Sequence, residues 1–197
     1  MCTTCRQSVH GGGSHGLRCR RSVERFARHS AINEEIRKAL CSSFITAQRK
    51  PVGLLPNQLR PDGVTLVPWR EGKYAMWDAT VVDTLAPTYV MKTSVSAGEA
   101  ANSAEQSKRQ KYSSLPPGYD FYPLAFETLG CTGRTTADFL RDLCGRLRHA
   151  TGDEKAGHYF LQRLSLCLIR GNASSVMGTM LQNDGYQLED IALFINV

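Results

Sequence analysis

The first 21 residues constrain the fold of this chain more than any other segment. They are rich in Cys, Gly, His and Arg and show no apolar periodicity, so they cannot build a hydrophobic core of their own. Cys2, Cys5, His15 and Cys19 follow the spacing C-x2-C-x9-H-x3-C. Three thiolates and one imidazole satisfy the tetrahedral preference of Zn²⁺. We therefore expect residues 1–21 to form a zinc-knuckle-like segment that the metal orders.

Other interpretations of the cysteines remain open at this level. The four residues are also compatible with free thiols in a loose tail, and His10 is a competing ligand. Seven cysteines are an odd number, which argues against a framework of disulfides. The other four lie in apolar helix or strand patterns, where packing explains them better than chemistry; they are Cys41, Cys131, Cys144 and Cys167.

Positive charge is concentrated in the first third of the chain. Eleven of the 24 Lys and Arg residues lie within residues 1–60, against three of the 18 acidic residues. Such an asymmetry favours a polyanionic partner, and nucleic acid is the commonest one. A solvated basic arm without a ligand is the alternative. We expect DNA, or RNA, to be contacted by a set of arginines: Arg18, Arg20, Arg21, Arg25, Arg28 and Arg60.

The sequence argues against a membrane protein and a secreted one. It contains no run of about 18 consecutive apolar residues, which a membrane-spanning helix needs. It also does not begin with a charged start followed by an apolar stretch, as secretory signals do. We expect a nuclear or intracellular protein with no membrane partner.

The rest of the chain predicts an α/β domain. Apolar spacing predicts helices at 22–41, 96–115, 135–149 and 158–170, with a shorter one near 173–182. A turn at 70–73 joins strand candidates at 63–69 and 74–82 into a hairpin, and 119–129 is a further strand. This order predicts a small mixed sheet flanked by helices, within a domain at 22–182 and before a tail at 183–197.

Two aspartates are candidate ligands of a metal ion. Asp62 comes just before the first strand of the predicted hairpin, and Asp78 lies in the middle of the second. In that hairpin both carboxylates can converge on one ion, and hard oxygen ligands suit Mg²⁺. Such an ion lowers the pKa of the water it binds and stabilises charge on a phosphodiester. Alternatively, Asp62 caps a turn and Asp78 pairs with a nearby basic residue.

The helix predicted at 96–115 places a lysine where it can meet these acids. Its inward face steps through Ala97, Ala101, Ala104, Lys108, Tyr112 and Leu115. Lys108 on the face toward the sheet must reach solvent or meet acids, and Lys111 lies near the same face. A lysine beside two carboxylates can orient or help deprotonate an attacking water. An ordinary basic solvent face is the competing interpretation.

The chain resembles the restriction-like endonuclease region that follows the reverse transcriptase of site-specific LINE retroelements. The motifs that carry this resemblance run in the family's order over residues 2 to about 180: the Cys/His cluster with HGLRC at 15–19, Arg28-His29 with Ile32-Asn33, RPDG at 60–63, WDAT at 77–80, TLAPTY at 84–89, KRQKY at 108–112, ETLG at 127–130 and QRLSLCLIRGNA at 162–173.

The resemblance implies a PD-(D/E)XK nuclease fold and Mg²⁺-dependent nicking of DNA. It assigns the two acids to Asp62 and Asp78, and the displaced lysine and its tyrosine to Lys108 and Tyr112, with Lys111 as a substitute. His29 would support them. Ser30 stands where the family has Asn, and Thr80 stands where a lysine is usual. A catalytically inactive domain that still binds nucleic acid is therefore the alternative.

Overall fold

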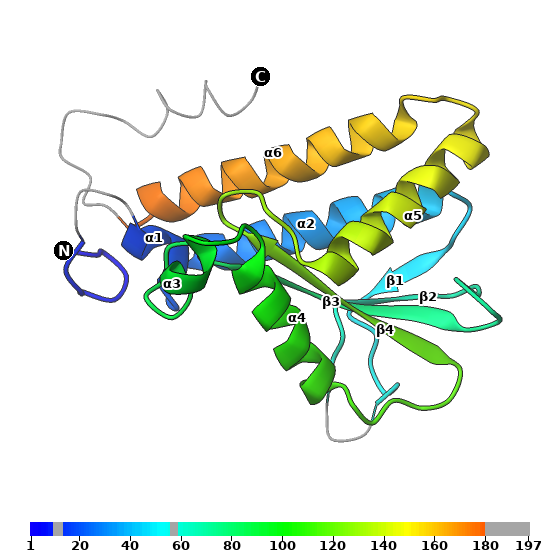
Figure 1. Cartoon of the computed structure of the whole chain (residues 1–197), viewed down its shortest axis with the longest axis horizontal. Helices are drawn as coiled ribbons and strands as arrows, with labels where there is room; N and C mark the ends of the chain where they lie inside the picture. Colours follow the sequence, from blue (N-terminus) through cyan, green and yellow to red (C-terminus); the bar gives the residue numbers. More distant parts are fainter. Residues whose placement is uncertain (10–13, 56–58, 180–197) are drawn as a thin grey trace.

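The computed structural model describes residues 1–9, 14–55 and 59–179, and it is mixed α/β, as the sequence predicts. Its sheet has four strands in the order β1-β2-β3-β4 (Figure 1). These are β1 (Ala47–Arg49), β2 (Gly63–Thr65), β3 (Tyr74–Val82) and β4 (Tyr119–Glu127). β1, β2 and β3 pair antiparallel, whereas β3 and β4 pair parallel, so the sheet is small and mixed.

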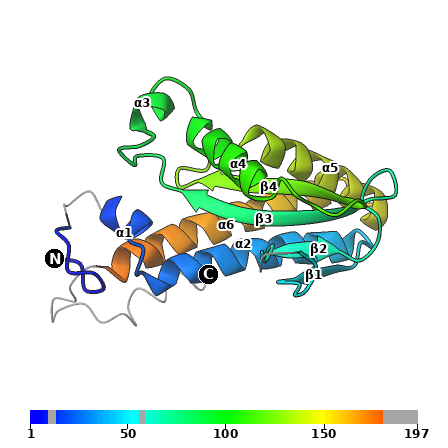
Figure 2. The same cartoon turned by 90° about the horizontal axis from the view of Figure 1, so that it is seen from below.

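Helices cover both faces of this sheet (Figure 2). They are α1 (Ser14–Arg18), α2 (Val23–Ser42), α3 (Val90–Thr93), α4 (Glu99–Lys111), α5 (Arg134–Thr151) and α6 (Ala156–Met177). The main core joins α2, α5 and α6 to alternate strand residues, among them Trp77 and Leu124. On the opposite face, Ala101 and Ala104 of α4 pack on Ala125. These small side chains let α4 approach the sheet closely.

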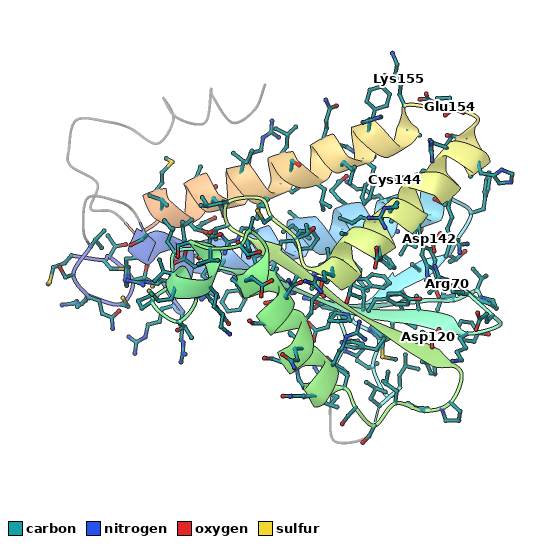
Figure 3. All side chains as sticks on the ribbon, in the orientation of Figure 1. Arg70, Asp120, Asp142, Cys144, Glu154 and Lys155 are labelled. Carbon is teal, nitrogen blue, oxygen red and sulfur yellow. The ribbon has the colours of Figure 1, made fainter. Side chains whose placement is uncertain are left out.

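The hairpin of β2 and β3 is tied to the helical layer at its turn. The guanidinium of Arg70 lies 3.1 Å from the carboxylate of Asp142 on α5 (Figure 3). Beside it, the guanidinium of Arg146 lies 4.1 Å from the ring centroid of Trp69 and donates a hydrogen bond to that residue's carbonyl oxygen. These contacts fix the hairpin against α5.

The predicted elements at 22–41, 74–82, 119–129 and 135–149 are present with nearly the expected bounds. The helix predicted at 96–115 is shorter, because Gly98 adopts a φ of +87° and α4 begins after it, which leaves Ala97 exposed. The helices predicted at 158–170 and 173–182 are one helix, α6, as far as Met177. Residues 180–182 and the tail at 183–197 lie outside the described residues. The sequence patterns missed the short elements β1, α1 and α3.

The cysteines outside the N-terminal cluster differ in their surroundings. Cys144 and Cys167 pack against the main core, as predicted. Cys41 is exposed on α2, so the packing prediction is wrong for this residue, because the last turn of the helix presents it to solvent. Cys131 is half-buried.

Within the described residues, no helix is both long enough and apolar enough to cross a membrane.

Candidate functional site

The two predicted acids meet at the edge of β3. The register pairs Gly63 with Trp77, which brings the preceding Asp62 alongside Asp78. The backbone N–H of Asp62 donates to the carbonyl of Trp77 (2.9 Å), and its Oδ2 accepts a hydrogen bond from the N–H of Ala79 (2.7 Å). Both bonds hold the carboxylate against the strand.

The close packing of the residue 63 backbone against Trp77 requires a glycine at position 63. A Cβ atom built at this position would collide with the indole ring of Trp77, which lies directly over the backbone. The ring is fully buried, so it has no room to move aside. The RPDG and WDAT sequences are therefore packed partners, and their packing sets the distance between the two acids.

His29 completes a cluster with the acids. Its Nε2 lies 2.9 Å from Oδ2 of Asp62 and 3.1 Å from the carbonyl oxygen of Ala79. The candidate ligand atoms of His29, Asp62 and Asp78 all lie within 4.8 Å of one another. Burial lowers the pKa of His29, but the hydrogen bond and charge of Asp62 outweigh it and raise that pKa overall. Burial likewise raises the pKa of Asp62, and His29 brings it below its ordinary value.

Asn33 orients this cluster from one turn further along α2. Its side chain is buried, its Oδ1 accepts a hydrogen bond from Nε1 of Trp77 (2.8 Å), and its Nδ2 donates to the carbonyl of His29 (3.0 Å). Asn33 is part of a motif of the resemblance, but the sequence predicts no role for its side chain. The available signal was an amide between Ile32 and Ile36 on an otherwise apolar helix face, since such a group needs partners when it is buried.

Two lysines of α4 reach the cluster from the opposite face of the sheet. Nζ of Lys108 lies 2.7 Å from Oδ1 of Asp78, and Nζ of Lys111 lies 4.0 Å from its Oδ2. The side chain of Asp78 is only 7% exposed, whereas that of Lys111 is 50% exposed. Lys108 is therefore the main partner of the buried carboxylate, and Lys111 is an outer one.

Tyr112 supports the same region through its ring and its hydroxyl. The hydroxyl donates a hydrogen bond to the carbonyl oxygen of Arg60 (3.0 Å), two residues before Asp62, and the ring stacks on Phe121 at 4.3 Å between centroids. Burial, followed by the negative charge of Asp78, raises the pKa of Tyr112 above its ordinary value. Tyr112 is therefore a neutral hydrogen-bond donor in this site.

His29, Asp62 and Asp78 are the side chains of this cluster that could hold a metal ion. Asp62 and Asp78 offer carboxylate oxygens, and the carbonyl of Ala79 faces the same imidazole nitrogen as Asp62. Carboxylate and backbone oxygens, completed by water or phosphate, are the ligands that Mg²⁺ takes. Asp62, Asp78 and Lys108, which the sequence predicts around one ion, are thus neighbours in the fold.

The N-terminal cysteines and histidine also come together. Sγ of Cys2 lies 3.9 Å from Sγ of Cys19, and Sγ of Cys5 lies 3.1 Å from Nε2 of His15. All four ligand atoms lie within 4.8 Å of one another, so this cluster could bind zinc. Two sulfurs that each bind tetrahedral Zn²⁺ at about 2.3 Å are about 3.8 Å apart, close to the observed spacing. The competing ligand His10 lies outside the described residues.

The backbone around the cluster lowers the pKa of one thiol and packs the cluster against α6. Burial raises the pKa of the Cys2 thiol, but hydrogen bonds from the backbone N–H groups of Cys5 and Thr4 outweigh it and bring that pKa down to about 6. The cluster is also anchored to α6. A Cβ at Gly16 would lie 2.6 Å from Cα of Val176, so α1 and α6 are in direct backbone contact.

The predicted arginines fall into two groups. Arg18, Arg20, Arg21 and Arg60 are exposed, and Arg25 is half-buried. Arg28 is 2% exposed and donates hydrogen bonds to Asn172 Oδ1 and to the carbonyl of Leu17, and burial lowers its pKa to about 10. These internal hydrogen bonds occupy the guanidinium, and a nucleic-acid contact by Arg28 stays a prediction. Its side chain turns toward α6, where Gly171 leaves room for it.

A cavity of about 840 Å³ opens between α5 and α6. Cys144 and Leu161 lie on its walls, and the ion pair of Arg148 and Glu154 lies at its side. Figure 3 labels Cys144 on α5 and Glu154 between the two helices. Its lining comes from these helices and from the segment 126–132, so it is separate from the acids at the edge of β3.

Neither a protein-family model nor a curated protein matches this chain.

Proposed function

We propose that this protein is a Mg²⁺-dependent DNA endonuclease with a restriction-like catalytic domain, as its resemblance to the LINE endonuclease region implies. One observation supports this most: Asp62, just before β2, lies beside Asp78 of β3, and Nζ of Lys108 on α4 lies 2.7 Å from Oδ1 of Asp78. Two carboxylates and an ammonium group at a strand edge are what metal-assisted phosphodiester hydrolysis needs.

Each side chain has a distinct task in this proposal. Asp62 and Asp78 would hold the Mg²⁺ ion, which neutralises charge on the phosphodiester and lowers the pKa of water. Lys108 would orient the attacking water and stabilise charge on the phosphate, with Lys111 behind it. His29 holds Asp62 in place through its 2.9 Å contact. Water adds to phosphorus, the P–O3′ bond breaks, and the products are a 3′-hydroxyl and a 5′-phosphate.

The zinc-knuckle-like segment supplies DNA affinity in the same proposal. Zn²⁺ bound by Cys2, Cys5, His15 and Cys19 would order residues 1–21. Arg18, Arg20 and Arg21 are exposed there and would contact the phosphate backbone. Such contacts give affinity that falls with salt and does not depend on base sequence.

One observation favours the alternative of a nucleic-acid-binding domain without catalysis. Both acids already have internal partners, because Asp62 faces His29 and Asp78 faces Lys108. The raised pKa of His29 favours its protonated form, so these partners offset negative charge of the cluster without an ion. A domain that has lost its metal would keep these contacts and would still hold DNA through its arginines.

Incubation with supercoiled plasmid separates the two functions. The endonuclease converts it to nicked or linear DNA with Mg²⁺, and Asp78→Asn abolishes the conversion. Asp120→Asn is the matched control, since this β4 aspartate lies away from the cluster and pairs with Lys73. Retarded but uncut plasmid with the wild-type protein at every Mg²⁺ concentration would establish the binding domain instead.

A further inference from the structure

A pocket of about 290 Å³ adjoins the candidate metal centre on the side of α2. His29 belongs both to the lining of this pocket and to the acid cluster, so the pocket and the cluster share one residue. The other walls come from the start of α2, from β3 and from the residue after the Cys/His cluster; they are Arg20, Arg25, Phe26, Arg28, Thr80 and Val81.

Phe26 gives the pocket an unusual wall. Its side chain is 69% exposed although it is a large aromatic group, and it lies three residues before His29 on the same side of α2. An exposed ring at the mouth of a pocket is available for stacking. Nucleobases stack on such rings whatever their sequence, because every base has a π face.

The charges around the ring suit a phosphate group. Arg20 is exposed, and Arg25 is half-buried with its Nη1 donating to the carbonyl of Arg18. This hydrogen bond fixes the Arg25 side chain beside Phe26. An aromatic face with two guanidinium groups next to it matches a nucleotide better than it matches an uncharged apolar ligand.

The edge of β3 adds hydrogen-bonding groups. The carbonyl of Trp77 and the N–H of Ala79 both point toward Asp62, at the edge of the strand that β4 does not cover. Backbone direction repeats every second residue in a strand, so the N–H and carbonyl of Val81 point to the same edge. Val81 lies beyond Asp62 and lines the pocket. It therefore offers one donor and one acceptor to the edge of a base.

We propose that this pocket binds an unpaired nucleotide next to the phosphodiester that is cut, with its base stacked on Phe26. A paired base inside a duplex has no free face for such stacking, so the base must be unpaired or rotated out. The inference rests on the proposed function only for the position of the scissile phosphate. It names the preferred substrate as DNA with an unpaired nucleotide beside the cutting site.

The test measures binding without Mg²⁺, using the full zinc-loaded chain. The probes are a short duplex and the same duplex with one bulged 2-aminopurine. We expect the wild-type protein to bind the bulged probe about tenfold more tightly and to quench its fluorescence by stacking. Phe26→Ala should lose both the preference and the quenching but keep its affinity for the plain duplex, and Phe26→Trp should restore them.

Phe44→Ala is the matched control, because Phe44 is 80% exposed just after the other end of α2. It should behave as the wild-type protein does. The inference is overturned if the wild-type protein does not prefer the bulged probe. It is also overturned if Phe26→Ala prefers that probe as strongly as Phe44→Ala does. Because binding is measured without cleavage, the two proposals fail separately. If the protein prefers the bulged probe but does not cut plasmid, only the proposed endonuclease function is refuted. If it nicks plasmid but does not prefer the bulged probe, only the proposed nucleotide pocket is refuted.

Discussion

Nζ of Lys108 lies 2.7 Å from Oδ1 of Asp78, and this contact joins the last turn of α4 to the middle of β3. A carboxylate that is 7% exposed is costly to keep ionised without a partner. Lys108 supplies that partner from a helix whose alanine face lets it approach the sheet. In the proposed function, the same ammonium group would stabilise charge on the phosphate.

Replacing Lys108 with Met should lower both activity and stability. The variant leaves Asp78 with only the distant Lys111, so we expect nicking to fall by at least about 100-fold. The free energy of unfolding should fall by about 3 kcal/mol without metal, because a buried charge loses its partner. Mg²⁺ should restore part of this loss by replacing the missing positive charge. Nicking rates and urea unfolding with and without Mg²⁺ measure the three effects.

Lys92→Met is the control for that variant, since Lys92 is exposed on the short helix α3. It should change the free energy of unfolding by less than about 0.5 kcal/mol. If Lys108→Met nicks and unfolds like this control, the ion pair has no role in the site.

Metal analysis should find about one zinc per chain, because three thiolates and an imidazole fill a tetrahedral shell. Cys19→Ser removes one ligand and should lose most of the zinc, whereas Cys41→Ser changes an exposed cysteine of α2 and should retain it. Thiol titration provides the second measurement. A purified protein without zinc, in which all seven cysteines titrate freely, would contradict a zinc site.

Asn33→Leu should destabilise the protein and disturb the site. The variant leaves Nε1–H of the buried Trp77 without its acceptor, which costs about 1–3 kcal/mol of unfolding free energy. Nicking should also decrease, because His29 loses a contact that fixes it. Urea unfolding measures the first effect, with Gln106→Leu at an exposed position of α4 as the control. Equal stability of both variants would argue that the Asn33 amide is not needed.

Glu34 should make stability depend on acid pH. Hydrogen bonds from Arg37 and then Arg49, opposed by burial, lower its pKa from an ordinary 4.5 to about 2 in the folded protein. Its contribution is therefore complete above about pH 4.5 and is lost as pH falls toward 2. Because Glu34 is partly exposed, we expect Glu34→Gln to cost about 1 kcal/mol at pH 7 and less at pH 4.

Urea unfolding of the wild-type protein and of Glu34→Gln at pH 7 and pH 4 measures this difference in stability. Glu71→Gln, at an exposed position, is the control. A deficit of Glu34→Gln that is equal at both pH values, or larger at pH 4, would contradict the assigned pKa.

Local sequence patterns were enough to predict that Asp62, Asp78 and Lys108 lie close together. The turn at 70–73 fixes the register of the hairpin, and that register alone brings Asp62 beside Asp78. Helical period places Lys108 on the face of α4 that carries Ala101 and Ala104. These relationships depend on geometry within one element or between neighbours, which a sequence reveals directly.

Other features depend on how distant elements pack. The contact of His29 with Asp62 and the bond of Asn33 to Trp77 require α2 to cross β3, and no local pattern encodes that crossing. Arg28 is buried only because Gly171 of α6 leaves space for it. The three residues of β1 are too few to show a period of two.

Manganese binding tests the central claim most directly, namely that Asp62 and Asp78 hold one divalent cation. Mn²⁺ replaces Mg²⁺ at oxygen sites, and electron paramagnetic resonance reports its free concentration as zinc-loaded protein is titrated. We expect the wild-type protein and Asp120→Asn to bind Mn²⁺ equally, and Asp62→Asn and Asp78→Asn to lose that binding. Wild-type protein that leaves Mn²⁺ free, or acid variants that bind it as tightly, would contradict the account.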